Sequence, residues 1–360
     1  MRICVLGAAS SAHVMARAKV FAEFGHDVTL VTPAQGDTLG LNAAVCARGD
    51  KGRLGWLASV FAAVNGANAD IYHAHYAAEL TTWMAWLLGK RPLVVTVMGG
   101  DVLFDEQGSL GPVGRWLTRR AVRAAALVTV KSPLLGDIVA SWGVQRERIM
   151  NVVWGVDARI FSPNAEGAAK RRAEWGVGAD DTVLFSPRML KPLYNQLLMV
   201  EALVKVPGAQ LVLSTYNEDP AYRERVQTRA NELDVADRLR FVSAVSAPDM
   251  AASYSAADVV LSLPPSDGTP QSVMEAMACG APVVMTDLDR FKPLFTHGET
   301  GWFTRLDADA LATSVTTLLG DDDLRAHIAA NAKMLIKEQA DFETQARAVE
   351  ARMLQLLGNA

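Results

Sequence analysis

The sequence predicts an α/β protein made of two Rossmann-like, doubly wound domains that face a cleft. Three observations lead to this prediction: a length of 360 residues, many short apolar runs rich in β-branched residues, and longer helical patterns between most of these runs. Short runs that are apolar on both faces are typical of buried parallel strands, and parallel strands need helical crossovers. A chain of this length suits two domains of roughly 150–200 residues each.

The predicted strands fall into two sets. Those of the first half are Arg2–Leu6, Val28–Val31, Ile71–His75, Leu93–Val97, Leu127–Val130 and Ile149–Val153. Those of the second half are Thr182–Phe185, Gln210–Ser214, Arg240–Ser243, Val259–Leu263 and Pro282–Thr286. Gly155, Pro163 and a polar run from Asn164 mark a linker between them. We expect an N-terminal domain over residues 1–158 and a C-terminal domain over 159–341, followed by a last helix, Phe342–Leu357, that has no preceding strand.

Composition excludes several classes of protein. The net charge of -4 shows no basic excess that would indicate nucleic-acid binding. Three cysteines that lie far apart predict neither a disulfide framework nor a zinc site. There is no signal-like N-terminal segment and no run of eighteen apolar residues. We therefore expect a cytoplasmic enzyme.

The segment Pro265–Gly280 carries the functional prediction. A strand, Val259–Leu263, runs into a polar loop, and a short helix is expected to begin near Pro270 and to stop at Gly280. The free N–H groups and the dipole at a helix start favour an anionic ligand. Asp267 lies in the loop, and Glu275 lies about 7 Å further along the helix axis. Two acceptors so spaced could bind different parts of one extended ligand, such as a hexose and a ribose.

This segment resembles the signature of the retaining glycosyltransferases of the GT-B fold, family 4 (glycosyltransferase group 1). That signature has an acidic residue, seven residues, then Glu-Ala-Met-Ala-x-Gly-x-Pro-Val. The chain has Asp267 in the first position, where the family usually has Glu, and continues with Glu275-Ala-Met-Ala-Cys-Gly280-Ala-Pro-Val-Val. Further stretches are similar to other motifs of the family: Asn151–Pro163, Ala256–Pro264, Gly25–Thr32 and Asp70–His75.

The resemblance implies transfer of a sugar, with retention and without a metal, from a nucleotide-diphosphate sugar to an acceptor hydroxyl in glycan, polysaccharide or glycolipid biosynthesis. It implies that the C-terminal domain binds the donor, and that the N-terminal domain binds a sugar or lipid-linked acceptor and receives residues 342–360. The catalytic residues expected are Asp267, Glu275, Arg188 and Lys191. The donor-binding residues expected are Gly268, Thr269, Pro270, Gln271 and Ser243.

Arg188 and Lys191 would compensate the charge of the leaving diphosphate. Arg188 follows the strand Thr182–Phe185, where the family also has an arginine. The family's lysine, five residues later, corresponds to Leu193 in this chain. Lys191 is therefore a hypothesis, and a solvated lysine is an equally open interpretation.

The expected acceptor site lies in loops after strands of the first domain. Its residues are Ser10, His13, His75, Gly99, Gly100 and Asp101. His13 has a second interpretation as a local helix cap. His73 and His75 alternate on a strand and point the same way, but no third metal ligand accompanies them. Many relatives have His where this chain has Met98, which cannot accept a proton.

Several alternatives stay open. Arg115–Arg123 forms a basic helical surface, which is either a solvated face or a docking site for an anionic membrane or a lipid-diphosphate acceptor. Asp287-Leu-Asp289 fits the D-x-D motif of metal-dependent, single-domain transferases. A sugar-nucleotide 2-epimerase of the same architecture and a catalytically silent nucleotide-sugar binding protein are the other two hypotheses.

Overall fold

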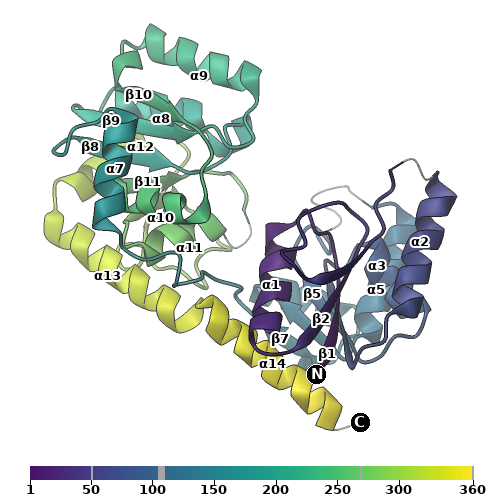
Figure 1. Cartoon of the computed structure of the whole chain (residues 1–360). Coiled ribbons are helices and arrows are strands. Elements are labelled where there is room, and N and C mark those ends of the chain that lie inside the picture. The colour runs from purple at the N-terminus through teal and green to yellow at the C-terminus, as the bar shows by residue number, and fades with distance from the viewer. Residues whose placement is uncertain (50–51, 104–109, 268–269, 359–360) are drawn as a thin grey trace. The chain divides into compact units, whose positions relative to one another are not determined.

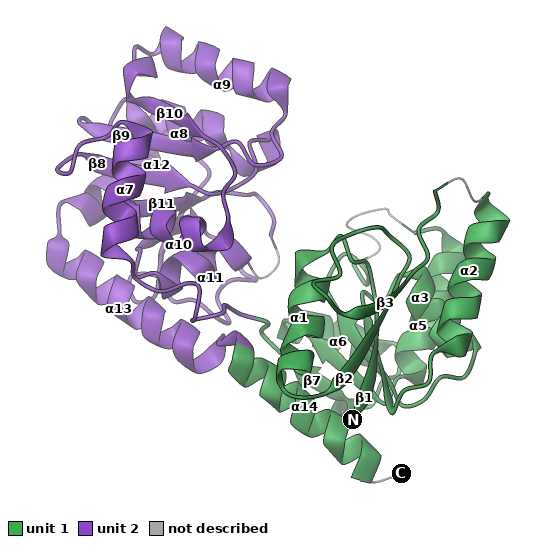
Figure 2. Ribbon diagram, in the orientation of Figure 1, with its two compact units in different colours: residues 1–154, 343–360 green, residues 155–342 purple. Residues whose placement is uncertain are grey.

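The computed structural model describes residues 1–49, 52–103, 110–267 and 270–358, which form two compact units. Unit 1 comprises Met1–Trp154 and Glu343–Ala360, and unit 2 comprises Gly155–Phe342 (Figure 2). The units thus divide after residue 154, whereas the expected domain boundary follows residue 158. Each unit contains one parallel sheet with helices on both faces (Figure 1).

The sheet of unit 1 has seven strands in the order β3-β2-β1-β4-β5-β6-β7. Their bounds are β1 Arg2–Leu6, β2 Asp27–Thr32, β3 Asn42–Val45, β4 Ile71–His75, β5 Leu93–Val97, β6 Leu127–Val130 and β7 Ile149–Asn151. The helices are α1 Ala12–Glu23, α2 Arg53–Gly66, α3 Leu80–Leu87, α5 Pro112–Ala124, α6 Pro133–Ser141 and α14 Phe342–Gly358, with a 3₁₀ turn at Arg146–Arg148. Figure 1 shows α2, α3 and α5 on one face of the sheet and α1 and α14 on the other.

The last helix, α14, packs in unit 1 through three kinds of contact. Ala346, Val349 and Met353 are its buried residues. Glu350 Oε1 lies 2.6 Å from Nε2 of His26, and the guanidinium of Arg347 lies 3.4 Å from the centre of the Phe24 ring. A helix without a strand of its own therefore gains its stability from this packing rather than from intrinsic propensity.

The sheet of unit 2 has six strands in the order β10-β9-β8-β11-β12-β13. Their bounds are β8 Thr182–Ser186, β9 Ala209–Ser214, β10 Leu239–Val242, β11 Val259–Ser262, β12 Val283–Thr286 and β13 Trp302–Thr304. The helices are α7 Ala165–Trp175, α8 Gln196–Leu203, α9 Pro220–Glu232, α10 Ala247–Ala256, α11 Gln271–Ala278, α12 Ala308–Leu319 and α13 Asp322–Gln339, with 3₁₀ turns at Pro192–Tyr194 and Ala236–Arg238. Apolar residues of α8, α9 and α12 form one core with β8, β9 and β11.

Two strands, β3 and β13, are absent from the prediction, and both lie at a sheet edge. The four residues of β3 are mostly exposed, and β13 has only three residues. Segments so short or so exposed lack the continuous apolar run that identifies the central strands, whereas the other two edge strands, β7 and β10, match predicted strands. The helix expected after the polar loop that contains Asp267 is present as α11, and Pro270 is its N-cap rather than its first helical residue.

The chain enters and leaves unit 2 through two segments that pair with each other. The N–H of Val156 donates to the carbonyl oxygen of Ala340 at 2.8 Å, and the N–H of Phe342 donates to that of Val156 at 3.1 Å. The preceding residue, Gly155, lies so close that a Cβ atom there would be 1.6 Å from the oxygen of Ala340. Glycine is required at position 155 because backbone, not a movable side chain, occupies that space.

We predict that Gly155→Ala lowers the free energy of unfolding by about 2–3 kcal/mol, because relieving the clash breaks the backbone pairing. Urea unfolding followed by circular dichroism measures the change. The matched control is Gly178→Ala, where the nearest atom to an added Cβ is at 3.4 Å. Equal stability of the two variants would contradict the requirement for glycine at 155.

Candidate functional site

In each unit the direction of winding reverses at one pair of neighbouring strands. In unit 1 this pair is β1 and β4, and in unit 2 it is β8 and β11. The crossovers from such a pair leave in opposite directions, so a crevice opens at the carboxyl ends of the two strands, and ligands of open α/β sheets bind there. Most of the predicted residues that the structure describes follow these four strands, whereas Ser243 follows β10 and Gly99, Gly100 and Asp101 follow β5.

In unit 2, Arg188 joins the loops that follow β8 and β11. Its Nη2 donates to Oδ2 of Asp267 at 2.7 Å, and its Nη1 donates to the hydroxyl of Ser272 at 3.0 Å. Its guanidinium also lies 4.4 Å from the centre of the Tyr194 ring. Both ionic side chains are largely buried, with 13% and 20% exposure for Arg188 and Asp267. The guanidinium is thus held rigidly beside the start of α11.

Lys191 lies in the same loop, three residues beyond Arg188. The structure gives its ammonium no hydrogen bond or ion pair with any residue that it describes. The two basic residues therefore differ in their surroundings, since Arg188 is fixed by three side chains and Lys191 is not.

Glu275 lies on the second turn of α11 and faces the neighbouring helix α10. The buried hydroxyl of Tyr254 donates to its Oε2 at 2.9 Å. Burial raises the pKa of Glu275 to about 7, against the opposing effects of Tyr254, Gln271 and Arg188. Gln271 itself donates from Nε2 to the carbonyl oxygen of Gly155 at 2.8 Å, which ties the start of α11 to the entry of the chain into unit 2.

Three residues of this site have no signal in the sequence motifs: Asn195, Tyr254 and Ser272. Asn195 adopts a left-handed backbone conformation (φ 56°), and its side chain donates to the carbonyl oxygen of Leu263 at 2.7 Å. This bond fixes the loop after β11 against the loop after β8. An asparagine that follows a short turn is the one hint that sequence offers, because Asn tolerates the left-handed region.

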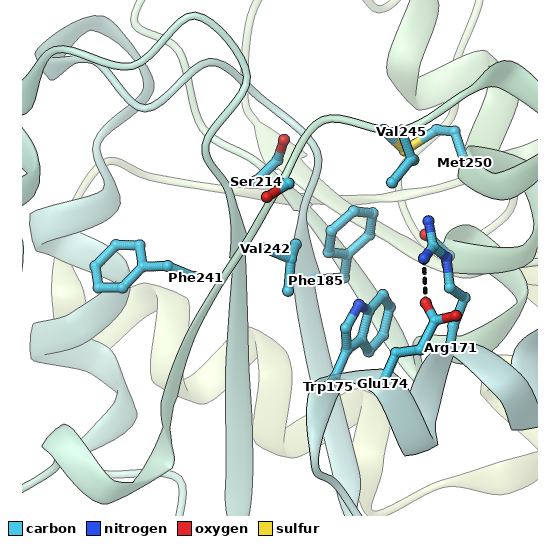
Figure 3. A pocket seen from close by; sticks show the side chains of 11 residues that line it. Arg171, Glu174, Trp175, Phe185, Ser214, Phe241, Val242, Val245 and Met250 are labelled. Carbon is cyan, nitrogen blue, oxygen red and sulfur yellow. Dashed lines mark hydrogen bonds and ion pairs between the residues drawn. The ribbon is translucent and has the colours of Figure 1, made fainter.

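Ser243, a predicted donor residue, lines a cavity of about 280 Å³ beside α7 and α10 (Figure 3). Aromatic side chains form much of its wall, and the rings of Trp175 and Phe185 stack with centres 5.5 Å apart. Arg171 pairs with Glu174 in the same wall, while its Nη2 is buried without a hydrogen-bond partner. Phe185 also contacts Tyr254 at 6.0 Å between ring centres, so this cavity adjoins Glu275. The planar apolar walls suit an aromatic ligand.

Unit 1 has a second cavity, of about 320 Å³, at the carboxyl ends of β1, β4 and β5. Its lining residues are Ala8, Ser11, His13, Val14, Arg17, His75, Tyr76, Glu79 and Met98. Of the predicted acceptor residues, His13 and His75 are part of this lining. Ser11 rather than His13 caps α1, since its hydroxyl accepts from the N–H of Val14.

The remaining predicted residues of unit 1 surround this cavity without lining it. Ser10 is exposed, and Gly99 adopts a φ of 119° in the loop that it shares with Gly100. Asp101 is fully buried, and its carboxylate accepts backbone N–H groups of Ala77, Met98 and Gly99 at 2.7, 3.0 and 2.8 Å. Its side chain orders the loop in this structure. Two further predicted residues, Gly268 and Thr269, lie outside the described residues.

Among the residues that the structure describes, no group of three or more His, Cys, Asp or Glu side chains could hold a metal ion. The rings of His73 and His75 contact each other with their centres 4.1 Å apart and their planes tilted by 40°. Asp287 and Asp289 both pair with Lys292, at 3.1 and 2.7 Å. Within the described ranges, every helix is too short or too polar to cross a lipid bilayer.

Comparison with known proteins assigns the two halves of the chain to two related families. Residues 168–334 match the glycosyl transferases group 1, and residues 7–155 match the glycosyl transferase 4-like domain. The D-inositol 3-phosphate glycosyltransferase of Corynebacterium efficiens is 26% identical over 307 residues, which cover 80% of this chain and 71% of that enzyme. The enzyme of that name from Mycobacterium tuberculosis is 28% identical over 243 residues, which cover 64% of this chain and 50% of that protein.

The fold agrees with these matches. The crystal structure of Anabaena HepE in complex with UDP and glucose superposes with a TM-score of 0.83 at 20% identity, over 99% of this chain and all of that one. A structural similarity at 20% sequence identity shows the fold alone. The family assignment comes from the two sequence matches, one in each half of the chain. The chain is therefore a glycosyltransferase of the GT-B fold and belongs to the group 1 transferases of family 4.

Proposed function

We propose that this protein transfers a sugar from a nucleotide-diphosphate sugar to an acceptor hydroxyl, with retention of configuration and without a metal ion, in glycan, polysaccharide or glycolipid assembly. The observation that supports this most strongly is the position of Arg188, held between Asp267 and Ser272 at the start of α11. A departing nucleoside diphosphate gains negative charge as the sugar bond breaks, and a fixed cation beside a helix start stabilises that charge.

The donor would bind along unit 2 in an extended form. The base would enter the aromatic cavity beside Ser243, where Trp175 and Phe185 offer planar contacts. Glu275, oriented by Tyr254, would accept hydrogen bonds from the ribose hydroxyls. Once the diphosphate takes over the donors of Arg188, Asp267 becomes available to the hydroxyls of the transferred sugar. The ion pair between them keeps both side chains in place until the donor arrives.

Retention needs no side-chain base in this proposal. The leaving phosphate oxygen would take the proton of the acceptor hydroxyl on the same face of the sugar, so catalysis depends on positioning and charge. Met98, where many relatives have His, has no proton to exchange. A 2-epimerase would instead convert the nucleotide sugar to an isomer without any acceptor. Incubating the donor alone and looking for this isomer therefore distinguishes an epimerase from a transferase. A silent binding protein would bind the donor without transfer or hydrolysis.

A panel of UDP-, GDP-, ADP- and CMP-linked sugars tests the donor site by thermal shift, because a ligand that binds the folded state raises its apparent stability. We predict that one nucleotide raises the unfolding temperature equally with and without EDTA, and that Arg188→Ala abolishes this shift and lowers turnover roughly 100-fold. Lys191→Ala is the matched comparison. Near-wild-type turnover in either variant removes that residue from the site, and activity lost in EDTA contradicts metal independence.

We predict opposite effects of Glu275→Gln on function and on stability. Because burial raises the pKa of Glu275 from 4.5 to about 7, its contribution to stability is complete below pH 4.5 and is lost as the pH rises through 7. At pH 8 the variant should therefore unfold at a higher temperature than the wild type, by roughly 2–4 °C for each kcal/mol recovered, with a smaller difference at pH 5. Turnover should fall roughly ten- to hundredfold as a charged hydrogen-bond acceptor is lost.

Calorimetric scans at both pH values and initial-rate assays measure these effects. An unchanged rate would remove Glu275 from the donor site. A variant less stable than the wild type at pH 8 would contradict the raised pKa.

We further propose that α5 contacts an anionic membrane. The helix carries Arg115, Arg119, Arg120 and Arg123, and it exposes Val113 and Trp116 to 72% and 51%. The guanidinium of Arg120 lies 5.5 Å from the centre of the Trp116 ring, so charge and apolar surface occur side by side. Such a combination suits an interfacial helix, which binds through buried apolar area and attraction to anionic lipids.

Vesicle co-sedimentation tests this contact. We predict binding to phosphatidylglycerol vesicles but not to phosphatidylcholine vesicles, and a loss of roughly 30-fold in the double variant Arg119→Gln/Arg120→Gln, at about 1 kcal/mol for each charge near the surface. Arg91→Gln, an exposed arginine outside α5, is the control. Equal binding to both lipids would leave α5 as a solvated face.

A further inference from the structure

The cavity of unit 1 contains a buried cation that has no carboxylate partner among the residues that the structure describes. Arg17 extends from the second turn of α1 and is only 3% exposed. Its Nη1 donates to the sulfur of Met98 at 3.1 Å, and its guanidinium lies 4.5 Å from the centre of the Trp154 ring. No ion pair joins it to any of the described acidic residues. Burial lowers its pKa to about 9, so it still carries its charge at pH 7.

A second polar side chain of this cavity lacks a partner. His75 lies at the end of β4, is completely buried, and has no hydrogen bond to a described residue at Nδ1 or Nε2. Its pKa is well below the ordinary value, first because of burial and then because of His73 and Arg17. The ring is therefore neutral and offers one N–H donor and one acceptor. Unpaired groups of this kind are costly in a protein interior, and a ligand that completes their hydrogen bonds removes the cost.

Three further described ionisable groups lie in or near this cavity: Glu79, His13 and Lys131. Burial raises the pKa of Glu79 to about 7, so that carboxyl is only partly ionised at neutral pH. The pKa of His13 is lowered, first by partial burial and then by the cations Arg17 and Lys131. Lys131 also borders the loop after β5, where its Cε would lie 3.8 Å from a Cβ on Gly99. Among the described lining residues, the buried guanidinium of Arg17 is therefore the group that favours an anionic ligand.

We propose that the cavity of unit 1 binds an oxyanion of the acceptor, either a phosphate monoester or a carboxylate on a small polyol, through the guanidinium of Arg17 and a ring N–H of His75. Identifying this ligand as the acceptor rests on the proposed transferase function, whereas anion binding does not. Guanidinium groups bind phosphate and carboxylate oxygens with strong, charge-assisted hydrogen bonds. The volume of about 320 Å³ lies at the lower end of small-molecule sites, which suits one ring with one charged substituent.

Isothermal titration of the whole protein tests the proposal without any transfer reaction. The probes are three matched pairs: myo-inositol and its monophosphates, glucose and glucose 6-phosphate, and glucose and glucuronate, each titrated with and without UDP. We expect at least one anionic probe to bind roughly ten- to hundredfold more tightly than its neutral partner. A preference for phosphorylated probes alone, or for glucuronate alone, identifies the oxyanion. Inorganic phosphate alone should bind more weakly than the phosphorylated polyol, since it fills only part of the cavity.

Variants then assign the anion to the cavity. Arg17→Met removes the charge while retaining an apolar stem beside Trp154 and should abolish the preference, whereas Arg17→Lys should retain part of it. Arg91→Gln is the control, because Arg91 is exposed at the amino end of β5, the opposite edge of the sheet from the cavity. Nucleotide-sugar binding, measured by thermal shift, should be unchanged in Arg17→Met and shows that this variant is folded.

Two outcomes overturn the proposal: wild-type protein that binds no anionic probe more tightly than its neutral partner, or a preference that survives in folded Arg17→Met. If Arg17→Met does not fold, the wild-type titrations still show whether an anionic probe is preferred, and Arg17→Lys still shows whether that preference depends on Arg17. Anion binding by a protein that transfers no sugar from any donor would refute the transferase function and leave the anion site standing.

Discussion

The reversal of winding at one strand pair in each sheet is the constraint on which both candidate sites depend. Crossovers that leave β8 and β11 in opposite directions cannot cover the carboxyl ends of these strands. The loops that carry Arg188 and Asp267 therefore meet at this edge, although 79 residues separate them in sequence. The same reversal between β1 and β4 brings α1, His75 and Met98 around one cavity. Neither site needs a dedicated scaffold, because both follow from the order of parallel strands.

The two sites treat buried charge in opposite ways. Arg188 already has a carboxylate and a hydroxyl as partners, so its position is fixed at little electrostatic cost. Within the described part of the chain, the partners of Arg17 are a sulfur atom and an aromatic ring, which compensate a positive charge weakly. Glu275 is likewise held where burial opposes its ionisation. Groups kept in such unfavourable states are typical of binding sites, where a ligand supplies what folding leaves unsatisfied.

The structure shows the surroundings of the three residues, Met98, Asp267 and Leu193, that differ from the family pattern. Met98, where relatives have His, accepts a hydrogen bond from Arg17 and so belongs to the cavity of unit 1. Asp267, one carbon shorter than the usual Glu, pairs directly with Arg188. Leu193, in the place of the family's lysine, is an exposed residue in the middle of the 3₁₀ turn at Pro192–Tyr194. Two of these three differences, Met98 and Asp267, thus lie in the candidate sites.

The pattern of apolar runs was sufficient to predict the α/β class, eleven of the thirteen described strands and the helix α11, because buried parallel strands and helix ends leave strong local signals. The motif around Asp267 and Glu275 likewise indicated the family before any coordinates. Strands β3 and β13 were not predicted, since β3 is mostly exposed and β13 has only three residues, so neither gives a long apolar run. Only the tertiary structure joined Arg188 to Asp267 and Ser272, placed Tyr254 against Glu275, and set Arg17 against Met98 and Trp154. Such pairings depend on which loops the strand order brings together, and residues distant in sequence carry no local trace of them.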